Sequence, residues 1–395
     1  MTDTYDAVVV GGGPAGATAA ADLAGNGRSV LLLDKAGRIK PCGGAVPPIL
    51  IRDFAIPDHL LVARAKGARI VAPSAAEADM PIEGGYVGMV DREQFDEWLR
   101  ERAATAGAER REGSFESVTR DPDGVARVHF MPKGATESAS VRARAVIGAD
   151  GAKSAVARQC VPGADHVKYV FAYHEIVRAP APSPGYDPTR CDIYYQGPLS
   201  PDFYAWVFPH GDTMSIGTGS ARKGFGLRPA VTRLREQTGL AGLETIRREG
   251  APIPLRPMKR WDNGRDIVLA GDAAGVVAPA SGEGIYYAML GGRLAADAVE
   301  LLCKTGEAKS LRTARKRFMK AHGRVFLVLG FMQWFWYHND KRRETFVKMC
   351  RDKDVQRLTW DSYMNKKITK RDPMAHVRVF LKDMAQLVGM ARQRA

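Results

Sequence analysis

Apolar and polar positions near the start of the chain follow the order strand, glycine-rich turn, helix, strand. Residues 5–10 form a short apolar run, three consecutive glycines follow, and an alanine-rich stretch comes next. A second apolar run, residues 29–34, ends in Asp34. Continuous apolar runs of this length are typical of strands buried on both faces of a parallel sheet, so the pattern predicts a β-α-β unit.

A second pattern, in residues 200–212, places aromatic side chains in one predicted strand between two prolines. With a period of two, one face carries Tyr204, Trp206 and Phe208, and the other carries Phe203, Ala205 and Val207. Both faces are apolar, which is typical of a strand inside a sheet. The pattern also fits a wall facing a flat or apolar ligand, so the strand alone leaves both interpretations open.

Residues 325–337 form a nearly unbroken apolar run of 13 residues. This run is too short to span a bilayer, which needs about 20 residues. One interpretation is a buried helix of the fold. The other is a helix in the membrane interface, with Trp334, Trp336 and Tyr337 at headgroup depth and the basic residues Lys341, Arg342 and Arg343 behind them.

Composition indicates a globular protein large enough for two or more lobes, with 395 residues of which 45% are hydrophobic and 26% charged. The five cysteines lie far apart without a C-x-x-C pair, which argues against a disulfide framework or a zinc site, and no other spacing resembles a metal site. This cysteine usage is typical of a reducing compartment. The N-terminus has no basic region before its apolar run, so we expect no signal peptide and a cytoplasmic protein.

The net charge of +14 belongs to the C-terminal segment. Residues 311–395 contain 21 Lys or Arg against 7 Asp or Glu, whereas the residues before them balance. Such a segment could meet nucleic acid, an acidic protein or an anionic membrane surface. No helix-turn-helix, zinc-finger or RNA-binding motif accompanies the charge, so we expect no nucleic-acid partner.

The glycine-rich turn carries a dinucleotide-binding motif. Gly11, Gly13 and Gly16 form G-x-G-x-x-G between the first strand and the helix, and Asp34 ends the second strand. In this context the glycines let the backbone approach a pyrophosphate, and the Asp34 carboxylate can accept hydrogen bonds from ribose hydroxyls. A carboxylate would repel a 2′-phosphate, so the tightly held nucleotide should be FAD or NAD.

Three later motifs favour FAD. Residues 267–299 predict a strand, Asp272 at a glycine turn, and a glycine-rich entry to a helix that includes Gly282, Gly284 and Ile285. Asp150 follows another predicted strand, and Arg92 opens a predicted helix. In flavoproteins with one Rossmann unit, a similar aspartate reaches the ribityl chain and a helix N-terminus points at the flavin. For Arg92, a surface salt bridge remains a second interpretation.

These motifs, in this order, resemble flavoproteins of the p-hydroxybenzoate hydroxylase type. Two further stretches, residues 40–47 (KPCGGAVP) and the pattern P-x-x-Y-x-W-x-F-P from Pro201 to Pro209, resemble the geranylgeranyl reductase family. Residues 342–367 resemble the chlorophyll-pathway branch of that family. The resemblance implies an α/β chain with a single-Rossmann FAD-binding fold, a mixed-sheet substrate lobe and a helical C-terminal segment.

The resemblance also implies an activity. Bound FAD takes hydride from NADPH and delivers it in three rounds to isolated double bonds of a geranylgeranyl chain, giving phytyl. The implied substrate is a geranylgeranylated bacteriochlorophyll or chlorophyll, with free geranylgeranyl diphosphate as a second candidate. We find no second G-x-G-x-x-G, so a nicotinamide would bind transiently. The implied location is peripheral, on the photosynthetic inner membrane, through the basic and aromatic C-terminal segment.

An isolated alkene is a poor hydride acceptor, so the site must couple hydride transfer to protonation. The candidate catalytic residues are Tyr204 and Trp206 as walls of the prenyl tunnel and Cys42 as a group near the flavin. The expected cofactor-binding residues are Gly11, Gly13, Pro14, Ala15, Gly16, Asp34, Lys35, Cys42, Gly43, Gly44, Arg92, Asp150, Asp272, Gly282, Gly284 and Ile285. Core packing for the two aromatic residues, and inert packing for the thiol, remain open.

We expect a discontinuous FAD-binding domain from residues 1–65, 88–160 and 262–302, a substrate lobe from 66–87 and 161–261, and a basic, mainly helical segment from 303–395. Two other functions fit a chain of this class: a monooxygenase acting on a small aromatic compound, and a non-enzymatic carrier of pigment or prenyl chains. The aromatic strand around Trp206 and the apolar, basic tail are unexpected for the first of these.

Overall fold

The computed structural model describes residues 3–35, 39–183 and 186–366, and within them the β-α-β unit forms as expected. Its strands belong to a six-stranded sheet in which β1, β2, β8, β10 and β16 pair in parallel, and β9 runs antiparallel between β8 and β10. The strands are β1 (Thr4–Val10), β2 (Val30–Asp34), β8 (Glu109–Arg120), β9 (Ala126–Pro132), β10 (Ala139–Gly148) and β16 (Ile267–Leu269). The central strands are buried, which explains their apolar runs.

Helices cover this sheet and bring the predicted motifs to its edge. They are α1 (Pro14–Gly25), α3 (Arg92–Thr105), α4 (Ala155–Cys160) and α6 (Ile285–Thr305). α1 packs against both α3 and α6. A short 3-10 turn, Gly271–Ala274, follows β16 and carries Asp272.

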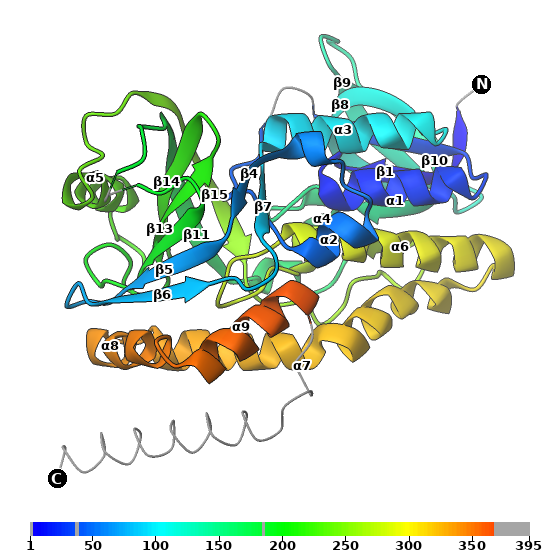
Figure 1. Cartoon of the computed structure of the whole chain (residues 1–395). Helices are drawn as coiled ribbons and strands as arrows, with labels where there is room; N and C mark the ends of the chain where they lie inside the picture. The colour runs from blue at the N-terminus through cyan, green and yellow to red at the C-terminus, as the bar shows by residue number, and fades with distance from the viewer. Residues whose placement is uncertain (1–2, 36–38, 184–185, 367–395) are drawn as a thin grey trace.

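A second sheet has seven strands in the order β15-β11-β14-β13-β12-β5-β6, antiparallel except where β12 meets β5. Its strands are β5 (Gly67–Val71), β6 (Glu77–Pro81), β11 (Tyr169–Arg178), β12 (Arg190–Tyr194), β13 (Ala205–His210), β14 (Thr213–Ser220) and β15 (Thr245–Pro254). Helix α5 (Leu227–Gln237) packs on β14 and β11. A small sheet of β3 (Ala45–Val46), β7 (Val87–Val90) and β4 (Leu61–Ala65) lies between the two large sheets, with α2 (Pro48–Asp53) beside it (Figure 1).

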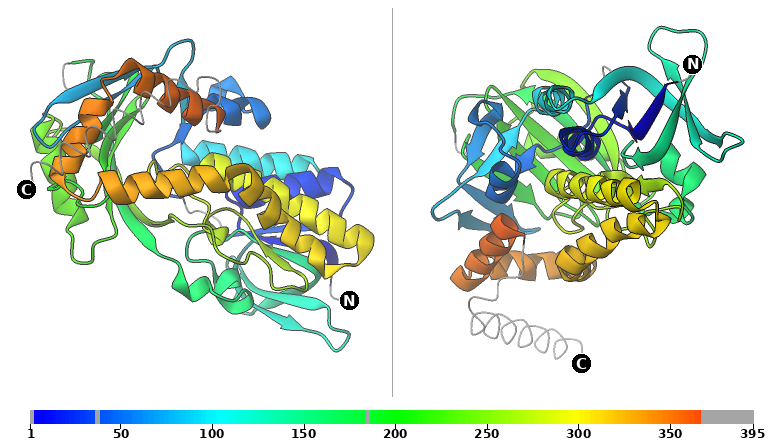
Figure 2. Two further views of the ribbon diagram at one scale, coloured as in Figure 1. Left: turned by 90° about the horizontal axis from the view of Figure 1, so that it is seen from below. Right: turned by 90° about the vertical axis from the view of Figure 1, so that its right-hand side faces the viewer.

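Within the described residues, three α-helices follow α6 and lie along one side of the molecule (Figure 2). They are α7 (Arg312–Trp336), α8 (Asp340–Met349) and α9 (Lys353–Asn365). α7 packs on α6, α8 reaches β6, and α9 contacts α2. Across the described residues, no helix is both long enough and apolar enough to cross a membrane.

The aromatic strand starts later than the sequence pattern predicts. Regular pairing begins at Ala205, because Ser200 to Phe203 form a turn in which the Phe203 backbone N–H donates to Ser200 Oγ at 3.0 Å. The prediction that Phe203 faces away from Tyr204 is therefore wrong: the two rings stack, with centroids 4.2 Å apart. Ala205 and Val207 do pack into a separate core with α5, on the opposite face.

Candidate active site

The turn after β1 closes tightly against the protein on one side and is open on the other. Gly11 has a φ of +106°, and a Cβ atom there would lie 2.4 Å from the Ala149 carbonyl oxygen. At Gly16 a Cβ would lie 1.8 Å from the Gly11 carbonyl oxygen. At Gly13, by contrast, a Cβ would have no described neighbour within 4 Å. Gly11 and Gly16 thus shape the turn, and Gly13 leaves free space for a ligand to approach the backbone.

The start of α1 suits an anion. Pro14 is its first residue, and no acidic side chain or side-chain cap occupies its first turn. Ala15 is buried against Gly292 of α6, where a Cβ would lie 2.1 Å from the Ala15 carbonyl oxygen. The position of the helix is therefore fixed, and its N-terminal N–H groups and positive dipole end can serve a pyrophosphate.

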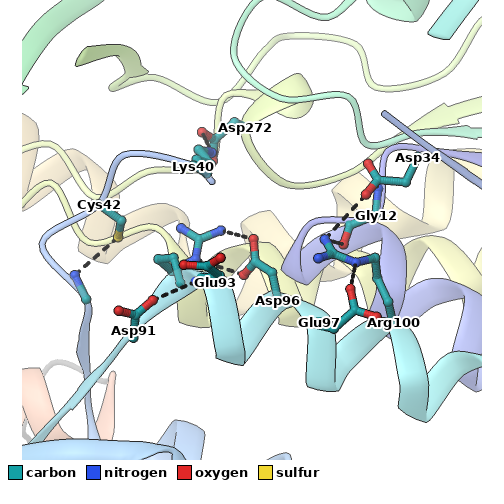
Figure 3. Close-up of polar contacts among 12 residues, drawn as sticks. Gly12, Asp34, Lys40, Cys42, Asp91, Glu93, Asp96, Glu97, Arg100 and Asp272 are labelled. Carbon is teal, nitrogen blue, oxygen red and sulfur yellow. Dashed lines mark hydrogen bonds and ion pairs between the residues drawn. The ribbon is translucent and has the colours of Figure 1, made fainter. Parts of the chain in front are cut away.

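Asp34 lies at the end of β2, directly beside this turn (Figure 3). Its Oδ1 accepts a hydrogen bond from the Gly12 backbone N–H at 3.0 Å, and its Oδ2 lies 3.3 Å from Nη1 of Arg100. Arg100 comes from α3 and also pairs with Glu97 at 2.8 Å. Sequence reasoning missed Arg100, which no motif marks. Lys35 follows Asp34 and is exposed.

Helix α3 connects the two ends of the candidate cofactor site. Arg100 reaches Asp34 (Figure 3), and Arg92, at the start of the helix, interacts with Cys42. Arg92 is buried and forms a two-pronged ion pair with Asp96, at 2.8 and 2.7 Å. Burial alone would lower the pKa of Arg92, but Asp96 and then Cys42 outweigh it and raise the pKa. The interpretation that Arg92 forms a surface salt bridge is therefore wrong about its location: Arg92 does form a salt bridge, but the pair is buried.

The Cys42–Gly44 loop lies against the aromatic strand. A Cβ at Gly43 would be 3.2 Å from the Phe208 ring, and one at Gly44, where φ is +71°, would be 2.5 Å from the Val90 carbonyl oxygen. The Gly44 backbone N–H donates to Cys42 Sγ at 3.4 Å. Only glycine lets this loop approach the strand so closely.

The structure brings Asp272 and the start of α6 together. A Cβ at Gly284 would lie 3.8 Å from Asp272 Oδ1, and Ile285 begins the helix. Lys40, from the KPCGGAVP motif, forms an ion pair with Asp272 Oδ2 (Figure 3). Sequence reasoning gave Lys40 no role, although it lies within a motif that was recognised.

The three aromatic side chains expected to line a ligand are all buried; Tyr204 directly precedes β13, and Trp206 and Phe208 lie within it. Ring centroids are 5.9 Å apart for Tyr204 and Trp206 and 6.1 Å apart for Trp206 and Phe208. The Tyr204 hydroxyl donates to the Ser281 carbonyl at 2.5 Å, which ties the strand to the loop before α6. Burial raises the pKa of Tyr204 well above its usual value, so its hydroxyl stays protonated.

A second group of tyrosines extends this wall, and sequence reasoning missed its role. The hydroxyl groups of Tyr195 and Tyr337 form a hydrogen bond at 2.9 Å, and the Tyr337 hydroxyl also donates to the Ala280 carbonyl at 3.0 Å. Tyr337 and Trp336 are buried in the cluster that contains Tyr204. Placing these two residues at headgroup depth is therefore wrong, because they pack inside the protein.

Asp150 lies next to the glycine turn but has a local partner. Its Oδ2 accepts from the Ala155 and Val156 backbone N–H groups at 2.6 and 3.2 Å, and its Oδ1 accepts from the Ser154 hydroxyl. Burial raises the pKa of Asp150, although these hydrogen bonds oppose the rise. The observed role is that of a cap for α4, and contact with a cofactor stays a prediction.

The open glycine turn, the free start of α1, Asp34, and Asp272 beside the start of α6 are the groups that would hold an FAD molecule. Together they define an oxidoreductase that binds FAD with a single Rossmann unit. The FAD binding domain family matches residues 61–318, and the NAD(P)-binding Rossmann-like domain family matches residues 9–59. These matches confirm the predicted fold class and the prediction that the chain binds FAD.

Proteins with similar sequences and structures narrow the class of oxidoreductase. Geranylgeranyl diphosphate reductase of Rhodobacter capsulatus is 58% identical over 386 residues, covering 98% of both chains. The structure of a geranylgeranyl bacteriochlorophyll reductase-like protein from Thermoplasma acidophilum superposes with a TM-score of 0.82 at 22% identity, over 99% of both chains. That of p-nitrophenol 4-monooxygenase from Pseudomonas putida gives 0.68 at 18% identity, over 92% of this chain and 98% of the other. The chain belongs to the geranylgeranyl diphosphate reductase family.

Proposed function

We propose that the protein is an FAD-dependent reductase that saturates three isolated double bonds of a geranylgeranyl chain, converting it to phytyl. We propose the bacteriochlorophyll or chlorophyll ester as substrate, with free geranylgeranyl diphosphate as a second substrate. The observation that carries this proposal is the buried aromatic wall on β13. It contacts both the Cys42–Gly44 loop and the loop before α6, where the flavin ring is expected.

The surroundings of the wall suit an apolar chain. Tyr204, Trp206 and Phe208 offer continuous ring surface, and the tyrosine and tryptophan polar atoms are turned away to Ser281 and Ser215. A prenyl chain would therefore meet carbon surface along the whole strand. The relatives name a reductase, and nothing in the site favours the monooxygenase over it.

When bound, reduced FAD supplies a hydride. The residues of the chain have three tasks beside it. Gly13, α1 and Asp34 hold the dinucleotide, and Lys40 with Asp272 lies where the ribityl chain is expected. The aromatic wall holds the alkene and excludes water, and its rings favour positive character on the alkene carbons if protonation runs ahead. Cys42 lies at the edge of this wall as a further candidate.

Product analysis tests the proposal. The FAD-loaded protein is reduced with dithionite and incubated with geranylgeranyl diphosphate or with geranylgeranylated bacteriochlorophyll, and the prenyl chains are analysed by mass spectrometry. We expect dihydro, tetrahydro and hexahydro products in sequence. Absence of all three with both substrates would contradict the proposed function.

We further propose NADPH as the electron donor. The described chain has one glycine turn of the dinucleotide type, and Asp34 beside it disfavours a 2′-phosphate, so NADPH must act through a transient contact elsewhere. Flavin bleaching under anaerobic conditions is measured with NADPH and NADH. Reduction that is at least as fast with NADH, or absent with both, would reject NADPH while leaving the dithionite-driven reaction intact.

We also propose that the protein binds the membrane surface through α7. Its outward face is basic in the first half and apolar in the second, with these exposed residues in order: Arg312, Lys316, Lys320, Arg324, Leu327, Phe331 and Trp334. Leu327 is 75% exposed, and Trp334 64%. Large apolar side chains next to cations are typical of a helix that lies in an anionic interface. This supports a peripheral location, on the photosynthetic inner membrane.

A further inference from the structure

The loop that leads into α6 holds a buried carboxyl group, Glu283, that the proposed mechanism has not used. Glu283 lies between Gly282 and Gly284. A Cβ at Gly282 would be 3.3 Å from the Tyr204 hydroxyl, and one at Gly284 would be 3.8 Å from Asp272 Oδ1. Glu283 thus stands where the aromatic wall, the cofactor loop and the start of α6 meet.

The only described ion-pair partner of Glu283 comes from the far end of the chain. Lys366, directly after α9, brings its Nζ to Glu283 Oε2, and both side chains are buried. The same Nζ lies 3.8 Å from the centre of the Tyr363 ring and 5.9 Å from that of Tyr287. Aromatic faces stabilise a cation that burial would otherwise disfavour.

Lys366 is the residue at which α9 ends, and its φ of +52° places it in the left-handed conformation in which many helices terminate. α9 also packs on α2, which follows the Cys42–Gly44 loop. The last described helix therefore packs beside the segment that follows that loop, and the residue after it brings an ammonium group to the carboxyl group of Glu283 at the entry to α6.

One oxygen of Glu283 is left without a partner. Oε1 is buried and has no hydrogen bond within the described residues, whereas Oε2 contacts Lys366. An unpaired buried oxygen is costly for a carboxylate, but a protonated carboxyl group can hold its proton there and offer it to a neighbour.

We propose that Glu283 is the acid that protonates the alkene, and that Lys366 is a positioning residue that stabilises the carboxylate it leaves. This inference rests on the proposed alkene reduction. As the π bond breaks, one alkene carbon takes the hydride supplied by the reduced cofactor and the other takes the proton from Glu283 Oε1, so two C–H bonds form. The carboxylate that is left stays paired with the Lys366 ammonium beside it, and it takes up a proton from a hydronium ion or buffer acid of the solvent before the next double bond is reduced.

The protonation state expected for Glu283 agrees with this role. The groups that face it are Lys366 and Tyr363 of the C-terminal helix, Tyr286 and Tyr287 of α6, and Tyr204 of the wall. Burial raises the pKa of Glu283, and Lys366 opposes part of that rise. The acid form is required, so alkene reduction should be present at low pH and lost as the pH rises through the raised pKa.

Glu283→Gln tests the acid, with Glu300→Gln as its matched control. Glu300 lies within α6 and is likewise an ion-paired carboxylate, bound to Arg28 at 2.7 Å. We expect Glu283→Gln to keep its FAD and to lose roughly 100-fold or more in alkene reduction, the usual contribution of a general acid. Glu300→Gln should keep the wild-type rate. A wild-type rate in Glu283→Gln would overturn the assignment, whereas an inactive wild type would instead reject the proposed function.

Two further measurements decide the case if Glu283→Gln folds poorly. In Lys366→Met, loss of the cation should raise the pKa of Glu283 further, so the alkaline limit of activity should move to higher pH. A purely structural ion pair would leave that limit in place. Without substrate, infrared difference spectra of the FAD-loaded protein should show the carbonyl band of a buried protonated carboxyl group that titrates with the alkaline limit. Absence of this band between acidic and alkaline pH would overturn the proposal.

Discussion

Trp206 is held from behind by a chain of hydrogen bonds. Its Nε1–H donates to Ser215 Oγ at 3.0 Å, and this hydroxyl lies 2.8 Å from Nδ1 of His174, whose Nε2 lies 3.1 Å from Glu249. With Nε1 fixed, the indole has one orientation available. Because the ring is already oriented, a ligand that binds against it would cost no further side-chain entropy at this residue.

Replacing Trp206 by Phe tests the ligand-wall interpretation with little disturbance of packing. The variant keeps an aromatic ring but loses the hydrogen bond that orients it, so we expect alkene reduction to fall about tenfold, or ~1.4 kcal/mol in activation free energy. FAD content, measured by flavin absorbance per protein, should be unchanged. An equal loss of FAD and activity would contradict the ligand-wall interpretation and would indicate that Trp206 has only a structural role.

His210 links the pH dependence of stability to the loop that carries Cys42. Its Nε2 would lie 2.5 Å from a Cβ at Gly44, and burial lowers the pKa of His210 from 6.5 to about 4. Because the unfolded chain binds the proton more readily, the stabilising effect is complete above pH 6.5 and is lost as the pH falls towards 4.

For His210→Gln, which cannot be protonated, we expect a flatter decline of unfolding free energy between pH 6.5 and 4. The difference from the wild type should reach as much as about 3 kcal/mol across that interval. Urea denaturation at several pH values measures it, with His129→Gln on β9 as the control. Parallel slopes for wild type and His210→Gln would show that this histidine titrates normally.

Among the elements, α8 anchors the start of the aromatic strand. Arg343 of α8 is buried, and its guanidinium donates to the carbonyls of Pro201 and, at 2.7 Å, of Tyr337, while pairing with Asp340 at 2.8 Å. The expectation that Arg343 lies behind a membrane-facing helix is therefore wrong. Its charge serves the turn that leads into β13.

Arg343→Met should destabilise the protein by about 2–4 kcal/mol, because it leaves the buried Tyr337 carbonyl and the partly buried Pro201 carbonyl without this donor. Lys348→Met, on the exposed side of the same helix, is the control and should change the unfolding free energy by less than about 0.5 kcal/mol. Equal melting temperatures for the two variants would contradict the anchoring role of Arg343.

The elements also show what the sequence could predict. The β-α-β unit and the entry to α6 were predictable, because glycine conformation and apolar runs are local properties. The apolar run of residues 325–337 contains two kinds of position that the sequence pattern does not separate. Phe331 and Trp334 are exposed, whereas Trp336 and Tyr337 are buried. The ion pair of Glu283 with Lys366 was missed, because nothing local relates two residues that far apart.

Over the whole molecule, basic charge and exposed apolar surface coincide on α7. Flotation with vesicles containing anionic lipid should recover the protein at low salt, and less of it as salt is raised, because salt screens the cations. Trp334→Glu should weaken recovery several-fold. Ile246→Glu removes an exposed apolar side chain of β15 and should not weaken it. Equal recovery of both variants, or none of the wild type at low salt, would contradict docking through α7.

The position of Lys366 has a consequence for synthesis. During translation the two sheets can assemble and the glycine turn can form before α9 has emerged, since domains begin to fold as soon as their residues are available. Until then Glu283 lacks the lysine with which it pairs in the folded protein, and α2 lacks its contact with α9. The groups expected to hold the flavin are therefore complete before Lys366 reaches Glu283, so cofactor insertion should be able to precede formation of this ion pair.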